Sequence, residues 1–193
     1  MNVTIIKYNA GNIGSVSNAL DRLGIGFSLS DDPDEIRGAD KVIFPGVGEA
    51  STTMKFLREK GLDRLLPDLK QPVLGICLGM QLMCRWSEEG DTAGMGIFPE
   101  NVRLFSDSLK VPHMGWNSVD FGPSGLFKGL NPGAYVYFVH SYYAETGTDT
   151  LATCLYGIPF SAALHRDNFY AVQFHPEKSG LPGQQILKNF IEL

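Results

Sequence analysis

Residues Val73–Gln81 read VLGICLGMQ, an apolar strand-like run that passes into helix formers, with Cys77 at the junction. Gly75 and Gly79 lie two residues before and two residues after the cysteine. This spacing is typical of a nucleophile elbow, a sharp turn from strand to helix that exposes a nucleophile. We expect a Cβ at either glycine to collide with neighbouring backbone. The turn also places the sulfur at the positive end of the next helix, which favours the thiolate.

The first half of the chain alternates strand and helix patterns around this turn. Apolar residues recur at helical spacing between short β-rich runs, and glycines at positions 24 and 61 mark helix ends. Such alternation predicts βαβ units, with a parallel sheet and helices on both faces. The expected strands are 3–8, 27–30, 41–44 and 72–76, and the expected helices are 13–23, a short turn or helix from 31, 50–60 and 80–89.

The second half is dominated by strand patterns separated by Gly, Pro, Asn and Asp clusters, which indicates a mixed sheet with antiparallel hairpins. The expected strands are 102–105, 117–121, 134–143, 151–156, 160–164 and 169–174, and a helix over 186–193 closes the chain. The chain contains no repeat, low-complexity segment or linker. We therefore predict one α/β domain over residues 1–193, with a central, mostly parallel mixed sheet flanked by helices and an antiparallel extension in the second half.

The composition restricts the class of protein. Charged residues make up 19% of the 193 residues and the formal net charge is −5, so nucleic-acid binding is not expected. No apolar run reaches the roughly 18 residues that a membrane span needs, and the first residues resemble a strand more than a signal peptide. Three cysteines without a Cys-x-x-Cys pair predict a reducing compartment, the cytoplasm, and neither a disulfide frame nor a metal site.

Each cysteine also has a purely structural interpretation. A cysteine in an apolar strand is most often a small buried hydrophobe, and the flanking glycines are what favour chemistry at Cys77. Cys84, on the expected helix 80–89, and Cys154, on an expected strand, have no such setting. We interpret both as packing residues.

A thiol nucleophile needs a base and a group that orients the base. His175 and Glu177 are separated by Pro176, which favours extended backbone, so we expect both side chains to leave on the same side. A carboxylate beside an imidazole sets its tautomer and stabilises the imidazolium. The alternative is a surface His and Glu at the end of a strand. Together with the elbow, the pair predicts a Cys–His–Glu triad.

The run Pro45-Gly46-Val47-Gly48 follows an expected strand, and its glycines permit unusual backbone conformations. Such a loop can direct an N–H towards a developing oxyanion, and the N–H of Leu78 would be a second donor. An ordinary strand-to-helix loop is the alternative interpretation.

These blocks together resemble the triad class of glutamine amidotransferases over essentially the whole chain. The resemblance rests on residues 45–48, 75–81 and 173–177. Segments 8–12, 112–117, 137–142 and 178–179 are similar to the glutaminase subunits of imidazole glycerol phosphate synthases, enzymes of histidine biosynthesis.

The resemblance implies an activity and a set of residues. Cys77, His175 and Glu177 would hydrolyse glutamine through a glutamyl thioester, without a metal or an organic cofactor. Backbone at Gly46, Val47 and Leu78 would form the oxyanion site. The amino acid head group of glutamine would be held by Gln81, Ser141 and Tyr142.

The resemblance also implies a partner, a cyclase subunit with a (βα)8 barrel, in a heterodimer that channels ammonia into imidazole glycerol phosphate and aminoimidazole carboxamide ribotide. The implied interface residues are Asn12, Trp116, Asn117, Tyr137 and Lys178. Two alternatives remain open: a glutaminase of another synthase (vitamin B6, purine or polysaccharide amidination), and a catalytically idle regulatory subunit. Residues 85–98 receive no role.

Overall fold

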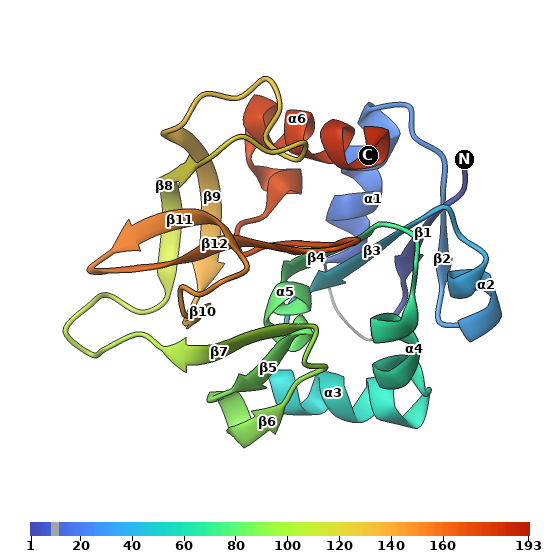
Figure 1. The fold of residues 1–193 in the computed structure, drawn as a ribbon, viewed down its shortest axis with the longest axis horizontal. Coiled ribbons are helices and arrows are strands. Elements are labelled where there is room, and N and C mark those ends of the chain that lie inside the picture. Colours follow the sequence, from blue (N-terminus) through green and yellow to red (C-terminus); the bar gives the residue numbers. More distant parts are fainter. Residues whose placement is uncertain (9–11) are drawn as a thin grey trace.

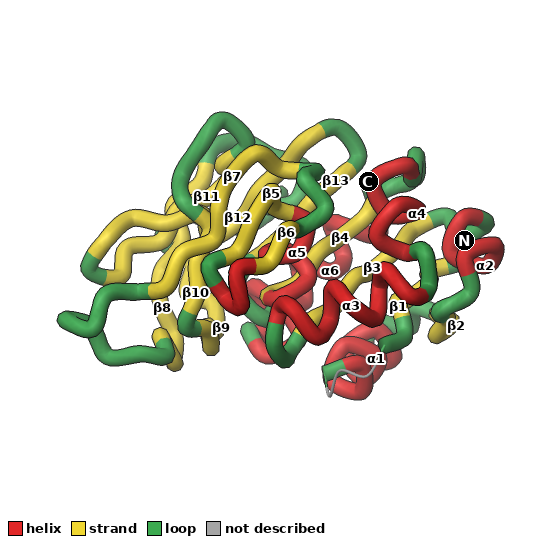
Figure 2. Tube along the Cα trace, turned by 90° about the horizontal axis from the view of Figure 1, so that it is seen from below, coloured by secondary structure: helices red, strands yellow, loops and turns green. Residues whose placement is uncertain are grey.

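The computed structural model describes residues 1–8 and 12–193. The predicted block 8–12 therefore falls partly on residues outside the described part of the chain. One sheet runs in the order β2-β1-β3-β4-β13-β12-β10-β7-β5-β6, and β11, β8 and β9 continue from β12 (Figure 1). Figure 2 places the antiparallel strands at one end of the molecule and the parallel strands at the other.

The parallel part of the sheet consists of β1 (Val3–Ile6), β2 (Phe27–Ser30), β3 (Lys41–Gly46), β4 (Val73–Cys77) and β13 (Phe169–Val172). β4 lies between β3 and β13 and is parallel to both. The carboxyl ends of these strands consequently meet at one edge of the sheet. This arrangement confirms the predicted mostly parallel, mixed α/β sheet.

Helices cover both faces of the sheet, as predicted (Figure 1). Apolar side chains of α1 (Ile13–Arg22) and α6 (Gly180–Glu192) belong to one core cluster. A second cluster lies under α2 (Pro33–Arg37), α3 (Ala50–Glu59), α4 (Leu62–Asp68) and α5 (Leu78–Met83). Within the described part of the chain, the helices are too short or too polar to cross a membrane.

The antiparallel part contains β7 (Phe98–Leu104), β8 (His113–Phe121), β9 (Ala134–His140), β10 (Tyr142–Ala144), β11 (Thr150–Tyr156) and β12 (Ile158–Arg166). The prediction of one strand over 134–143 was wrong, because the strand breaks at Ser141. β9 pairs with β8, whereas β10 pairs with β7 and β12, so the chain has to change neighbours between them.

The predicted helix 80–89 was also wrong beyond Met83. Residues Cys84–Ser87 form β5, which pairs with β7 and with β6 (Thr92–Ala93). The carbonyls of Leu82 and Cys84 accept hydrogen bonds from the amides of Met95 and Gly96. The returning chain thus satisfies backbone groups that a longer helix would have used. Cys84 lies in a strand, and both Cys84 and Cys154 are buried, in separate core clusters.

Candidate active site

Cys77 occupies a strained turn between β4 and α5. Its backbone has φ 53° and ψ −109°, an uncommon conformation for a residue with a side chain. A Cβ on Gly75 would lie 2.5 Å from the sulfur of Met83, and one on Gly79 would overlap the carbonyl oxygen of Phe44. The predicted elbow and the steric reason for its glycines are therefore confirmed.

The order of the parallel strands brings distant segments to this turn. Gly46, at the end of β3, lies opposite Cys77 in register, and Val172, at the end of β13, lies opposite Ile76. The residues that follow β3 and β13 therefore flank the cysteine. The chain places Val47 on one side of the elbow and His175 on the other.

The structure brings together the side chains of His175 and Glu177. Nδ1 of His175 lies 2.7 Å from Oε1 of Glu177, and both side chains are fully buried. The backbone differs from the prediction, because Glu177 lies in a short 3₁₀ turn, η2 (Pro176–Lys178), and not in extended chain. Proline is pre-organised for the first position of such a turn. The turn carries the carboxylate back to the imidazole.

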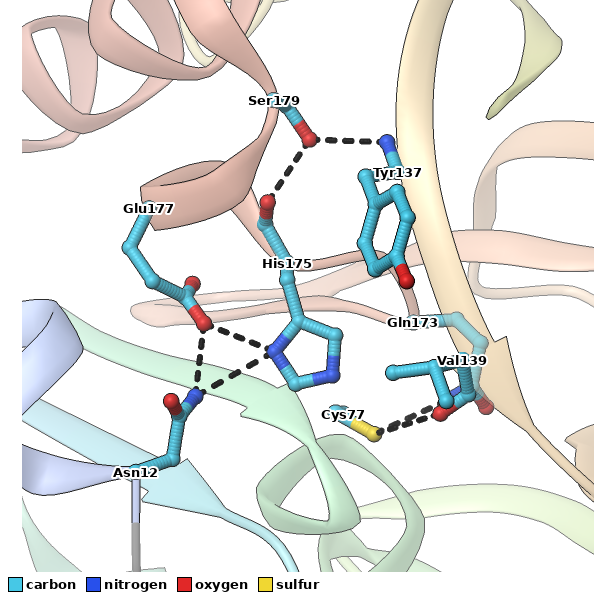
Figure 3. A network of polar contacts seen from close by, with 8 residues as sticks. All are labelled: Asn12, Cys77, Tyr137, Val139, Gln173, His175, Glu177 and Ser179. Carbon is cyan, nitrogen blue, oxygen red and sulfur yellow. Dashed lines mark hydrogen bonds and ion pairs between the residues drawn. The ribbon is translucent and has the colours of Figure 1, made fainter. Parts of the chain in front are cut away.

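Asn12 completes this cluster from the N-terminal part of the chain (Figure 3). Its Nδ2 donates a 2.6 Å hydrogen bond to Oε1 of Glu177 and lies 3.3 Å from Nδ1 of His175. Asn12 was predicted at a partner interface, and in the chain alone it is buried. It fixes the carboxylate that faces the imidazole.

The electrostatics of the cluster favour a charged imidazole. Burial lowers the pKa of His175, but the neighbouring Cys77 and the hydrogen-bonded carboxylate of Glu177 outweigh it and raise that pKa to about 10. For Glu177, burial raises the pKa, and the contacts with His175 and Asn12 outweigh this effect, so its pKa is lowered. The arrangement therefore supports an imidazolium at His175 beside the carboxylate of Glu177.

The sulfur of Cys77 lies beside this cluster (Figure 3). The amide Nε2 of Gln173 donates to the sulfur at 3.6 Å, and the carbonyl oxygen of Val139 is 3.9 Å away. Nε2 of His175 is buried and has no hydrogen-bond partner among the described residues. That nitrogen is the one free to exchange a proton with a reacting group. Gln173 is a residue of this site that the sequence did not single out, although it lies in the block that contains His175.

A cavity of about 350 Å³ opens over the sulfur. Its lining includes all three residues predicted to hold the substrate's head group, and both predicted oxyanion donors. Gly46 is buried beneath them, where a Cβ would lie 2.6 Å from that of Leu78. The lining residues are Val47, Gly48, Cys77, Leu78, Gln81, Glu89, Pro112, Val139, His140, Ser141 and Tyr142.

Gln81 uses its amide nitrogen within the protein. Nε2 donates to the carbonyl oxygen of Tyr142 at 2.8 Å and to Oε1 of Gln173 at 2.9 Å. Both N–H groups are thereby occupied. Only the Oε1 atom of Gln81 is available to a ligand, and it accepts hydrogen bonds.

Glu89 is a lining residue that sequence reasoning missed. It belongs to the turn η1 (Glu89–Asp91), within the segment that received no role, and its carboxylate accepts from the amide of Ala50 at 2.9 Å. Partial burial raises the pKa of Glu89. Glu89 lines the same cavity as Gln81 and gives it a carboxylate that suits an ammonium ion. The Glu88-Glu89 pair after Trp86 was the available signal.

Tyr8 supports the loop that carries Val47. Its hydroxyl donates a 2.6 Å hydrogen bond to the carbonyl oxygen of Pro45, within a buried contact. Burial, and then the nearby charge of Cys77, raise the pKa of this phenol. The hydroxyl therefore stays protonated and remains a donor to the loop.

The predicted interface residues other than Asn12 lie on or near the β8–β9 hairpin. Trp116 is 54% exposed, packs edge-on against Tyr137 and lies beside Gly180. Lys178 is exposed on the adjacent turn. Asn117 is half-buried and donates to the carbonyl oxygen of Leu155. Asn117 points towards β11, away from Trp116. Trp116, Tyr137 and Lys178 form one surface beside the predicted triad.

The arrangement can perform acyl transfer. A thiol on an elbow, an imidazole oriented by a carboxylate, and a cavity over the thiol are parts that nucleophilic catalysis on a carbonyl requires. Fold and site thus define a cysteine-dependent α/β enzyme of the acyl-transfer type.

Sequence comparison narrows this class. Residues 11–193 match the family model "Glutamine amidotransferase class-I". The chain is 58% identical over 196 residues to imidazole glycerol phosphate synthase subunit HisH of Bacteroides fragilis and 49% identical over 197 residues to that of Escherichia coli, with full coverage of both chains in each case. The chain therefore belongs to the class-I glutamine amidotransferases and, within them, to the family of HisH subunits.

Solved structures share the fold. A putative GMP synthase subunit from Thermoplasma acidophilum matches with a TM-score of 0.77 at 21% identity, covering 100% of this chain and 93% of the other. The glutaminase domain of Trypanosoma brucei CTPS, solved with bound acivicin, matches with a TM-score of 0.69 at 16% identity, covering 100% and 94%. At such identities the likeness concerns the fold alone.

Proposed function

We propose that residues 1–193 form one glutamine amidotransferase domain, the glutaminase subunit of an imidazole glycerol phosphate synthase. The observation that carries the proposal is the meeting of Cys77, His175 and Glu177 at one sheet edge, beneath a cavity of about 350 Å³. A nucleophilic thiol has to stay reduced, and for this reason the proposal places the chain in the cytoplasm.

The first half-reaction forms a thioester. The Cys77 thiolate attacks the side-chain amide carbon of glutamine, and the C–N bond breaks as His175 gives a proton from Nε2 to the departing ammonia. The negative oxygen of the tetrahedral intermediate accepts from the N–H groups of Val47 and Leu78. Glu177 keeps the other imidazole proton on Nδ1 throughout, since its carboxylate lies 2.7 Å from that atom.

The second half-reaction reverses these roles. The neutral His175 takes a proton from water at Nε2, and the resulting hydroxide attacks the thioester carbonyl. The C–S bond then breaks, which restores the thiolate and releases glutamate. Both steps use the same nitrogen, the one that has no hydrogen-bond partner among the described residues.

The head group of glutamine carries an ammonium and a carboxylate. In this proposal the ammonium binds between Oε1 of Gln81 and the carboxylate of Glu89, both of which line the cavity. Ser141 and Tyr142 also line the cavity, and in this proposal they hold the head group by hydrogen bonds. Neither a metal nor an organic cofactor enters the reaction.

The relatives are named as subunits of a synthase, which implies a partner subunit for this chain. We propose a cyclase with a (βα)8 barrel, joined in a heterodimer through the surface that contains Trp116, Tyr137 and Lys178. The ammonia would cross this interface without meeting bulk water. The cyclase would use it to make imidazole glycerol phosphate and aminoimidazole carboxamide ribotide.

The test is glutamate release by the purified chain alone, with a histidine-pathway cyclase subunit, and with that subunit plus its nucleotide ligand. We expect weak activity alone and strong stimulation in the loaded complex. Cys77→Ala should abolish glutamine-dependent synthesis and leave ammonia-dependent synthesis intact. Cys154→Ala, which changes a buried cysteine in β11, is the matched control. Glutamate release by the Cys77→Ala variant would refute the mechanism.

A further inference from the structure

His113 and His140 are two buried histidines outside the predicted triad. They lie opposite each other in register on β8 and β9, and neither is more than 5% exposed. Nδ1 of His113 lies 3.0 Å from Nε2 of His140. Aromatic rings surround the pair, including those of Phe105, Phe138, Tyr156 and Phe160.

The contacts determine where the protons lie. Nδ1 of His140 is 2.8 Å from the carbonyl oxygen of Tyr142, which can only accept, so Nδ1 carries a proton. In a neutral ring, Nε2 of His140 is then an acceptor, and the proton between the two rings belongs to Nδ1 of His113. Nε2 of His113 in turn accepts from Nδ2 of Asn117, 3.4 Å away. All donors therefore point one way, from Asn117 towards Tyr142.

Both rings must be neutral for this chain of donors to hold. A second proton on Nε2 of His140 would face the N–H of His113. Burial among aromatic side chains acts in the same direction, because it lowers the pKa of His113 to about 4 and that of His140 to about 3. The pair is thus a fixed set of neutral hydrogen bonds at neutral pH.

The chain of donors ends at the break between β9 and β10. His140 is the last residue of β9, Tyr142 is the first of β10, and Ser141 lies between them. The hydrogen bond from Nδ1 of His140 to the carbonyl oxygen of Tyr142 closes this bend. The same carbonyl accepts from Nε2 of Gln81, which leaves Oε1 of Gln81 free. His140, Ser141, Tyr142 and Gln81 all line the cavity.

We propose that His140, held in its tautomer by His113, is a positioning residue for the site of the glutamine head group. It fixes the bend that carries Ser141 and Tyr142, and through the Tyr142 carbonyl it fixes the orientation of Gln81. His140 acts on substrate binding and not on the thiol. The inference rests on the proposed glutaminase function.

Two substitutions separate the two sides of the His140 ring. In His140→Asn the side-chain Nδ2 takes the place of Nδ1, so the bond to Tyr142 is kept while the N–H of His113 loses its acceptor. In His140→Gln the amide reaches the place of Nε2, so His113 keeps an acceptor while the bond to Tyr142 is lost. Acivicin, a glutamine-like electrophile, serves as the probe. We expect it to label Cys77, with mass spectrometry as the readout.

We expect His140→Gln to raise the half-saturating acivicin concentration by about tenfold, the effect of one lost buried hydrogen bond. The maximal labelling rate and the rate of alkylation by iodoacetamide should not change. His140→Asn should label like the wild type although it unfolds at a lower temperature than His140→Gln. His165→Gln, at a surface histidine on β12, is the control.

Three results would overturn the positioning role of His140. Equal loss of acivicin affinity in both variants, or loss that follows the unfolding temperature, would show a structural role only and overturn the inference. If His140→Asn does not fold, an unchanged half-saturating concentration in His140→Gln overturns it alone. Failure of acivicin to label the wild type at Cys77 would refute the proposed glutaminase function itself, and with it the inference.

Discussion

The side-chain amide of Asn12 donates a 2.6 Å hydrogen bond to Oε1 of Glu177, which is 165 residues away in the chain. This bond joins the residue before α1 to the turn before α6. The other carboxylate oxygen, Oε2, is buried without a partner among the described residues. Asn12 and His175 therefore both help to hold this buried charge in place.

Asn12→Ala removes one donor from a buried carboxylate. We expect the free energy of unfolding to fall by about 1–3 kcal/mol, because an unsatisfied buried group is expensive. Glutamine turnover should fall by roughly 2- to 12-fold if half of this loss reaches the transition state. Urea unfolding and glutamate release in the loaded complex measure the two effects. Asn189→Ala is the control, since the amide of Asn189 donates to the backbone carbonyls of Leu126 and Lys128 and not to the proposed triad. It should lower stability and leave turnover unchanged.

Gly79→Ala tests the steric argument for the elbow. The new methyl group would overlap the carbonyl oxygen of Phe44 in β3, so β3 and α5 would have to separate. We expect a loss of at least about 3 kcal/mol in the free energy of unfolding, at the upper end of overpacking effects. Gly14→Ala is the control, because the space around Gly14 in α1 is open, and a stabilisation of about 0.5–1 kcal/mol is expected there. Equal stability of the two variants would contradict the steric argument.

The elbow and the triad pair were predictable because local rules specify them. Glycines two residues either side of a cysteine require a tight turn, whatever surrounds it. His175 and Glu177 are close in sequence, so they meet in either an extended or a turned backbone. For this reason the pairing was right although the expected backbone at Glu177 was wrong.

Glu89 and Asn12 show what the sequence alone could not predict. Glu89 reaches the cavity because Cys84–Ser87 leaves the helix and pairs with β7, a partner that lies later in the chain. Local propensity favoured a longer helix there, and tertiary pairing overrode it. Asn12 meets Glu177 only after the sheet has assembled, and no local pattern encodes a contact over such a separation.

Stability should depend on pH through the buried histidines. The pKa of His113 and that of His140 are lowered from 6.5 to about 4 and about 3. Between pH 6.5 and 4 the unfolded chain therefore binds more protons than the folded chain, and stability falls as the pH falls. Each histidine contributes up to about 1.4 kcal/mol per pH unit in this range. Urea unfolding between pH 5 and 6.5, where carboxylates contribute least, measures the slope.

The titration of His175 has the opposite effect on stability from that of His113 and His140. Its pKa is raised to about 10, so its stabilising contribution is complete below pH 6.5 and is lost as the pH rises towards 10. The histidines together predict maximal stability near pH 6.5. His140→Asn should flatten the acid side of the curve and His175→Gln the alkaline side, with His165→Asn as the control for each. An acid slope that persists unchanged in His140→Asn would contradict the assignment.

Trp116→Ala tests the surface proposed for the partner. Trp116 is 54% exposed in the chain alone. Tryptophan is among the residues that contribute most to binding at protein interfaces, so an exposed Trp116 is a candidate for the centre of this one. We expect the dissociation constant of the complex with the cyclase to rise by about 30-fold, the effect of a loss of about 2 kcal/mol. Leu155→Ala, on β11 at 68% exposure, is the matched control and should not change binding.

The same variant separates binding from chemistry. Trp116 packs against Tyr137, whose backbone accepts from the amide of His175, so a change at Trp116 could also disturb the proposed triad. Acivicin labelling of the variant alone, compared with labelling of the wild-type chain alone, answers this point. Normal labelling with weakened cyclase binding would place the interface at this surface. Normal labelling with unchanged binding would move the interface elsewhere, and the proposed ammonia path, which depends on this surface lying beside Cys77, would have to be abandoned.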